Sequence, residues 1–340
     1  MFKLENIVRK NILELQPYSS ARDEFKGEEG IFLDANENPF GNLNRYPDPY
    51  QKLLKQKLSN YKSIPLKNIF VGNGSDEVID LTFRIFCNPG KDKALTFSPT
   101  YGMYDVSAAI NEVDLIKIPL NDAFQINLNE LDTIIDNENL KLIIICSPNN
   151  PTGNSINYIE KILEKFNGIV LVDEAYIDFS DQPSFLNLLS QYPNLIIAQT
   201  FSKAWGLAAA RIGIAYASPS IIDLFNKVKP PYNVSKLNQE AAINALDLVD
   251  EFEKNRQYIL EQKLWLENEL KQCPLIKKIY PSDANFLFVE TTNANEIYHQ
   301  LVAQQVITRN RNNIHNNCIR ITVGSQTENL ALITALKNII

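Results

Sequence analysis

Short runs of apolar residues alternate with longer amphipathic stretches from residue 69 to residue 217. The short runs are rich in β-branched residues, as buried strands are, and the longer stretches repeat apolar residues every three or four positions, as helices do. This alternation predicts an α/β fold with a mostly parallel sheet covered by helices on both faces. The predicted strands are residues 69–71, 94–97, 115–118, 142–146, 169–172, 195–198 and 212–217, and the predicted helices between them include residues 78–86, 101–110 and 156–166.

The regular order of strand and helix ends near residue 234. A long helical stretch, residues 235–271, follows, and strands at 286–289 and 319–323 are then mixed with helices. This pattern favours a second, smaller α+β domain, and 340 residues are enough for two hydrophobic cores. We therefore expect an N-terminal arm at residues 1–30 that packs with the small domain, a large domain at 31–234 and a small C-terminal domain at 235–340.

Composition narrows the possible classes of function. A formal net charge of −7 argues against a nucleic-acid-binding protein, which normally carries a basic surface. No stretch approaches the ~18 apolar residues of a membrane helix, and the first residues lack the apolar run of a signal peptide. Four widely spaced cysteines and two histidines do not have the spacing of a zinc site or a disulfide framework. We therefore expect a cytoplasmic protein with no metal and no nucleic-acid or membrane partner.

Polar side chains follow several of the predicted strands, at the point where each strand ends. Ligands of open α/β sheets bind beside the carboxyl ends of the strands, so these side chains are candidates for one shared site. The candidates are Ser75, Asp76, Tyr101, Asn150, Asp173, Tyr176, Thr200, Ser202, Lys203 and Arg211.

Lys203 gives this group a possible chemistry. It lies on the connection between two buried strands, where partial desolvation or a nearby cation can lower the pKa of its amine and make it a nucleophile. The usual partner of such a lysine is pyridoxal phosphate, whose protonated ring nitrogen pairs with a carboxylate such as Asp173. Asn150 and Tyr176 can then bind the phenolic oxygen of the ring, and Tyr101 can stack on its face.

The same set of residues contains donors for a single phosphate group. Arg211 offers a planar fork of N–H donors, Thr200 and Ser202 offer hydroxyls, and a helix that begins at Ser75 or Asp76 offers free backbone N–H groups. Each candidate also has an ordinary structural interpretation, such as a helix cap for Asp173 or a surface charge for Arg211. Their occurrence together at successive strand ends favours a site.

Four motifs identify a resemblance to a known family. In chain order they are Ser-Pro-Asn-Asn-Pro-Thr-Gly, Asp-Glu-Ala-Tyr, Thr-Phe-Ser-Lys-Ala-Trp-Gly and Arg-Ile-Gly, and they resemble the fold-type I pyridoxal-phosphate-dependent aminotransferases. A more specific resemblance is to the histidinol-phosphate aminotransferases. It rests on Gln-Pro-Tyr-Ser-Ser-Ala-Arg, Asp-Ala-Asn-Glu-Asn-Pro-Phe-Gly, Arg-Tyr-Pro-Asp-Pro, Gly-Asn-Gly-Ser-Asp-Glu and Cys-Ile-Arg-Ile-Thr-Val-Gly.

The resemblance implies roles for residues of this chain. Lys203 would bind the cofactor aldehyde and move a proton between the substrate α-carbon and the cofactor, opposite Asp173. Tyr46 would reach the cofactor phosphate of the neighbouring subunit, which implies a homodimer with a shared active site. Arg320 would anchor the substrate. Arg309 and Tyr18 would help to hold the phosphate of histidinol phosphate or a carboxylate of glutamate.

This chain also departs from the family pattern. Ala208-Ala209-Ala210-Arg211 replaces the usual Ala-Gly-Leu-Arg, and Trp205 replaces a phenylalanine. The connection from 310 to 319 is shorter than usual, so Arg311 competes with Arg309 for the substrate-binding role.

The implied activity is transamination between L-histidinol phosphate and 2-oxoglutarate in histidine biosynthesis. An aromatic amino-acid aminotransferase and an amino-acid-phosphate decarboxylase are alternatives on the same fold. A regulator without enzymatic activity is a further alternative, because a fold does not fix function.

Overall fold

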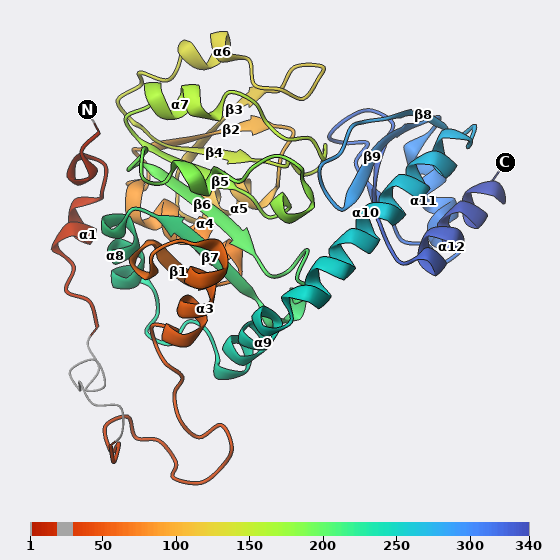
Figure 1. Cartoon of the computed structure of the whole chain (residues 1–340). Helices are drawn as coiled ribbons and strands as arrows, with labels where there is room; N and C mark the ends of the chain where they lie inside the picture. The colour runs from red at the N-terminus through yellow and green to blue at the C-terminus, as the bar shows by residue number, and fades with distance from the viewer. Residues whose placement is uncertain (1, 19–29, 340) are drawn as a thin grey trace.

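The computed structural model describes residues 2–18 and 30–339 and consists of two domains joined by one long helix (Figure 1). The large domain contains a seven-stranded sheet in the order β1-β7-β6-β5-β4-β2-β3. Every strand of this sheet is parallel to its neighbours except β7, which is antiparallel to both β6 and β1. The strands are β1 (Ile69–Asn73), β2 (Lys93–Ser98), β3 (Asp114–Pro119), β4 (Leu140–Cys146), β5 (Ile169–Asp173), β6 (Leu195–Thr200) and β7 (Ile212–Ala217). The predicted α/β fold is confirmed.

Helices cover both faces of this sheet because successive residues of a strand point to opposite sides. In β4, Ile143 and Ile145 enter one hydrophobic core, and Leu142 and Ile144 enter the other. The first core is closed by α3 (Lys52–Lys62), α6 (Leu128–Asp132), α7 (Ile159–Lys165) and α9 (Lys236–Asp247). The second is closed by α4 (Ser75–Phe86), α5 (Met103–Ile110) and α8 (Pro219–Val228).

The described part of the N-terminal arm packs on the large domain. Val8 and Ile12, the latter in α1 (Lys10–Glu14), join the apolar core formed by α4 and α8. The backbone N–H of Arg9 donates to the carbonyl of Ile85 at 3.0 Å, which fixes the arm beside the end of α4. The arm was expected to pack with the small domain. It lies on the large domain instead, because its apolar side chains are buried against α4 and α8. Residues 19–29 of the predicted arm lie outside the described part of the chain.

The small domain is built on a four-stranded antiparallel sheet in the order β10-β11-β9-β8. Its strands and helices are β8 (Ile276–Ile279), β9 (Phe286–Thr291), β10 (Arg309–Asn310), β11 (Cys318–Thr322), α11 (Ala294–Ala303) and α12 (Gln326–Lys337). Leu266 and Leu270 of the connecting helix α10 (Val249–Lys271) belong to its core. By contrast, α9 packs into the large domain, so that domain continues beyond residue 234.

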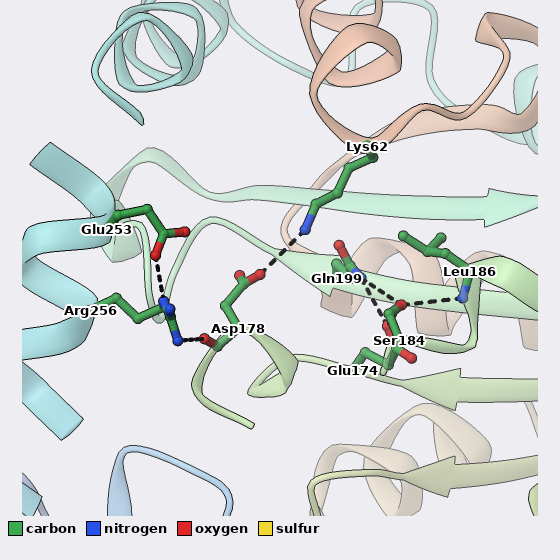
Figure 2. A network of polar contacts seen from close by, with 8 residues as sticks. All are labelled: Lys62, Glu174, Asp178, Ser184, Leu186, Gln199, Glu253 and Arg256. Carbon is green, nitrogen blue, oxygen red and sulfur yellow. Dashed lines mark hydrogen bonds and ion pairs between the residues drawn. The ribbon is translucent and has the colours of Figure 1, made fainter. Parts of the chain in front are cut away.

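Polar and aromatic contacts hold α10 against the large domain. Figure 2 shows Arg256 of α10 bonded to Glu253 and donating to the carbonyl of Asp178 at 3.3 Å, and Lys62 of α3 paired with the Asp178 carboxylate. The ring of Trp205, just after Lys203, stacks on Phe252 of α10 with centroids 3.9 Å apart. The loop that carries Lys203 is therefore packed against the helix that leads to the small domain.

Candidate active site

A pocket of about 350 Å³ lies at the carboxyl ends of β4, β5 and β6 and extends to the small-domain strands β10 and β11. It brings together residues from six segments of the sheet domain and from the small domain. The lining residues are Ser75, Asp76, Tyr101, Cys146, Asn150, Asp173, Ala175, Tyr176, Thr200, Ser202, Lys203, Arg211, Arg309, Arg311 and Arg320.

Lys203 extends into this pocket from the turn that follows β6. Its Nζ lies 5.6 Å from the centroid of the Tyr176 ring. Partial burial lowers the pKa of the Lys203 amine, and the positive charge of Arg320 lowers it further, whereas Asp173 acts in the opposite direction. A lowered pKa increases the fraction of neutral amine, which is the form that attacks a carbonyl.

Asp173 ends β5 and is buried beneath the pocket. Its Oδ2 accepts a hydrogen bond from the Tyr104 hydroxyl at 2.8 Å, and its Oδ1 accepts one from the backbone N–H of Ala175 at 3.1 Å. Burial raises the pKa of this carboxyl, and the two hydrogen bonds oppose that rise. A carboxylate held in this way is suited to a cationic partner, because an unpaired buried charge is costly.

A chain of hydrogen bonds connects the two domains across the pocket. The Asn150 amide donates to the Tyr176 hydroxyl at 3.2 Å, and Arg320 of β11 donates to the Asn150 carbonyl oxygen at 2.5 Å. Phe286 of β9 supports both ends, since its ring contacts the edge of the Tyr176 ring and lies 5.2 Å from the Arg320 guanidinium carbon. The small domain therefore orients residues that the sheet domain supplies.

Arg211 and the first residues of α4 form the other end of the pocket. The Arg211 guanidinium bonds Asp76 at 3.1 Å and approaches the Ser202 hydroxyl at 3.5 Å. It lies over Gly74, where φ is +79° and an added Cβ would be 2.5 Å from Nη2. The Thr200 hydroxyl instead shapes the turn, because it accepts from the Ser202 backbone N–H and donates to the Ile212 carbonyl.

Gly213 explains how β7 comes so near to the start of α4. A Cβ at this position would lie 2.2 Å from the backbone nitrogen of Ser75. Only a glycine permits this approach, which brings Arg211 beside the free N–H groups of the helix. The donors at this end are the kind that bind a phosphate group.

Three arginines face the pocket from the small domain. Arg309 and Arg320 are direct partners across β10 and β11, and Arg311 lies two residues further along the same side. Among the described residues none of the three pairs with a carboxylate, and the Nε atoms of Arg311 and Arg320 are buried without a partner. Burial lowers the pKa of Arg311 to about 10, and the neighbouring Arg320 and Arg309 contribute. This excess of positive charge favours an anionic ligand.

Tyr101 covers the side of the pocket near α5. Its hydroxyl donates to Asp76 at 3.3 Å, and its ring meets the edge of the Tyr104 ring with centroids 5.6 Å apart. Burial raises the pKa of the Tyr101 hydroxyl to about 12, and Asp76 contributes. The ring is therefore held in place at the wall where a flat ligand could stack.

Two residues of the predicted site lie outside this pocket. Tyr46 is 50% exposed and stacks on Tyr232 with centroids 4.3 Å apart, and Tyr18 is 71% exposed. Within the described residues, no cluster of His, Cys, Asp or Glu could hold a metal ion. Over the same residues, none of the helices is both long enough and apolar enough to span a membrane.

Comparison with known proteins places this geometry in a family. The model of the family "Aminotransferase class I and II" matches residues 24–336. This chain belongs to that family. The aminotransferase is 51% identical to the histidinol-phosphate aminotransferase of Cytophaga hutchinsonii and 50% identical to that of Bacteroides fragilis, with 99% of both chains covered in each case.

Solved structures are similar to this aminotransferase over most of its length. The histidinol-phosphate aminotransferase of Clostridium acetobutylicum gives a TM-score of 0.80 at 25% identity and covers 88% of this chain and 91% of its own. That of Sinorhizobium meliloti, solved in complex with pyridoxal-5'-phosphate, gives 0.79 at 25% identity and covers 90% of both chains.

The residues of this aminotransferase fit the cofactor that the sequence predicts. A buried carboxylate lies near a lysine of lowered pKa, and Gly74 and Gly213 let Arg211 and the start of α4 approach closely, so that their N–H donors lie at one end of the pocket. Two residues of the arrangement were not anticipated, namely Tyr104 behind Asp173 and Cys146 in the wall of the pocket. Cys146 pairs with Asp173 across β4 and β5, so its place could have been found from the strand order.

Proposed function

We propose that this protein transfers the amino group of L-histidinol phosphate to 2-oxoglutarate, which yields imidazole acetol phosphate and L-glutamate in histidine biosynthesis. The observation that carries the proposal is one pocket in which the Lys203 amine faces three arginines that lack carboxylate partners among the described residues. The relatives named as histidinol-phosphate aminotransferases, about half identical over nearly the whole chain, support the same substrate.

Pyridoxal phosphate, when bound, supplies an electron-poor ring that stabilises negative charge at the substrate α-carbon. Asp173 would accept the hydrogen bond of the ring nitrogen, and Asn150 and Tyr176 would bind the ring oxygen. Arg211, Ser202 and the first N–H groups of α4 would hold the phosphate. Hydrogen bonds within the protein already orient several of these side chains, so less reorganisation is needed when the cofactor binds.

Lys203 Nζ is the group that would move the proton. As a neutral amine of lowered pKa, it would take the proton from the substrate α-carbon and deliver it to C4′ of the cofactor. The ring of Tyr176 lies beside this amine, with its centroid 5.6 Å from Nζ. A substrate bound in this pocket, which residues of both domains line, would displace water from these atoms and strengthen the charge interactions around them.

The arginines would select the substrate. A phosphate dianion suits several guanidinium groups, and the two carboxylates of glutamate can use the same donors in turn. Arg320 is held by Asn150 and would anchor the reacting end, while Arg311 and Arg309 would bind the outer anion. Tyr18 retains its proposed role in gripping the substrate, although it lies outside the pocket of this chain.

We also propose a homodimer in which Tyr46 completes the site of the neighbouring subunit. Support comes from the exposure of Tyr46 and of the apolar side chains Ile31, Leu33 and Phe40 in the same segment, which a partner would cover. A cytoplasmic location is part of the proposal, since the four cysteines are separate thiols, as a reducing compartment would keep them.

An absorbance titration tests the function. The purified protein is loaded with pyridoxal phosphate and mixed with L-histidinol phosphate, phenylalanine or O-phosphothreonine, and 2-oxoglutarate is then added. We expect conversion of the cofactor to the pyridoxamine form with histidinol phosphate and its reversal by 2-oxoglutarate. Faster conversion by phenylalanine, or release of CO₂ from O-phosphothreonine, would replace the substrate assignment. A protein that stays colourless with the cofactor would contradict enzymatic function altogether.

A further inference from the structure

Tyr104, the second residue of α5, lies behind the carboxylate of Asp173. Its side chain is fully buried, and its hydroxyl donates to Oδ2 of Asp173 at 2.8 Å. The backbone N–H of Ala175 donates to the other carboxylate oxygen at 3.1 Å. Each oxygen of the carboxylate therefore has one donor from the protein, and the orientation of the group is fixed before any ligand binds.

We propose that Tyr104 is a positioning residue, which keeps Asp173 ionised and directed toward the pocket through this hydrogen bond. The consequence for the cofactor rests on the proposed function, because it requires a protonated pyridine nitrogen opposite Asp173. The hydrogen bond itself does not depend on the cofactor.

The surroundings of Asp173 explain why such a donor is needed. Burial raises the pKa of its carboxyl, and the negative charge of Asp76 adds to this effect, whereas Lys203 acts against it. A hydrogen bond from Tyr104 to the charged form lowers the pKa and so favours the carboxylate. The other ionisable groups that face this carboxylate are Tyr101, Cys146 and Tyr176.

Tyr104 remains a donor over the whole working range of pH. Burial and the adjacent Asp173 raise the pKa of its phenol well above the ordinary value. The ring of Tyr104 has a separate task, because it supports Tyr101 by an edge contact. Phenylalanine at position 104 keeps this ring contact and removes only the hydroxyl.

The matched control is a second buried tyrosine. Tyr216 on β7 is also fully buried, and its hydroxyl has no partner among the described residues. Tyr216→Phe therefore removes the same atom from a comparably buried site without affecting Asp173. If Tyr104→Phe acted only through a general loss of packing, its effect on Asp173 would be the same as that of Tyr216→Phe.

The test follows the Asp173 carboxyl itself in cofactor-free protein. The protein is labelled with aspartate carrying ¹³C at the side-chain carboxyl, and Asp173→Asn identifies the signal. Losing a hydrogen bond to a charged group corresponds to about one to two pKa units, so Tyr104→Phe should raise the titration midpoint by that amount. Tyr216→Phe should leave it in place. An unchanged midpoint in Tyr104→Phe, or an equal shift in both variants, would overturn the inference.

Two further measurements complete the test. Because the carboxylate of Tyr104→Phe forms only at higher pH, the variant should bind pyridoxal phosphate more weakly and lose it at a higher pH on acidification. A shifted midpoint with unchanged cofactor affinity would refute the positioning role. If Tyr104→Phe does not fold, 3-fluorotyrosine at position 104, a stronger donor, should lower the midpoint instead. A wild-type protein that does not bind the cofactor would refute the proposed function while leaving the carboxyl titration interpretable.

Discussion

Replacing Arg311 by glutamine removes one of three positive charges from the wall of the proposed substrate pocket. The guanidinium is half-buried, its Nε is covered without a partner among the described residues, and Arg320 and Arg309 both lower its pKa. Burial and the neighbouring positive charges therefore disfavour the charged guanidinium, and a bound anion would offset this. We expect the variant to bind the phosphate of the substrate more weakly while the reacting atoms stay in place.

The magnitude follows from these contacts. A charge-assisted hydrogen bond contributes about 1.5–3 kcal/mol, and relief of repulsion among the arginines offsets part of its loss. About 1.5–2 kcal/mol remains, which corresponds to roughly a ten- to thirtyfold fall in kcat/KM for L-histidinol phosphate, carried mainly by KM.

Arg309→Gln is the matched comparison because Arg309 lies two residues before Arg311, on β10, but is exposed to solvent. An exposed charge is screened, so its removal should cost less than about fivefold in kcat/KM. Steady-state kinetics of both variants, with 2-oxoglutarate saturating, distinguish the two arginines. A larger loss in Arg309→Gln than in Arg311→Gln would refute this reasoning and assign the anion to Arg309.

Three further predictions concern the amine, the sheet and a buried charge. Lys203→Ala should abolish turnover, which steady-state kinetics check, and should still bind the cofactor non-covalently, which dialysis checks. Residual turnover above a few per cent would contradict the role of the amine. Gly213→Ala places a methyl group against the start of α4 and should lower stability by about 1–3 kcal/mol in thermal unfolding, whereas Gly102→Ala, with open space around it, should change little. Lys55 is buried, and desolvation is the main cause that lowers its pKa to about 8. The amine therefore binds a proton less readily in the folded protein than in the unfolded chain. Lys55→Met should therefore raise stability by on the order of 3 kcal/mol below pH 8, a gain that fades toward pH 10.5, and exposed Lys52→Met should show no such dependence.

Much of the large domain could be predicted from the sequence, because strands buried on both faces are continuous apolar runs. The direction of β7 could not, since periodicity carries no information on whether neighbouring strands are parallel. In the small domain, β8 is interrupted by two lysines and β10 has only two residues, so neither gives a strand signal. The place of the arm depended on which apolar surface it covers, which only the packed structure shows.

Some residues of the candidate site could also be predicted from the sequence, and others could not. Polar residues after strands could be recognised because the carboxyl ends of parallel strands meet at one edge of the sheet. Tyr104 could not, since its spacing is that of a core aromatic and its partner Asp173 is 69 positions away. A tyrosine instead of a phenylalanine at a buried helix position was the one available signal. Arg309 and Arg320 are brought together by the register of β10 and β11, and Arg311 follows β10 directly, an arrangement that sequence spacing alone did not settle.

The most direct test of the central claim is to locate the cofactor bond in the protein chain. The protein loaded with pyridoxal phosphate is reduced with borohydride, digested and examined by mass spectrometry, with Lys203→Ala treated in parallel. We expect a single reduced pyridoxyl group on Lys203 that is absent from the variant. Modification of a different lysine, or an equal yield in the variant, would contradict it.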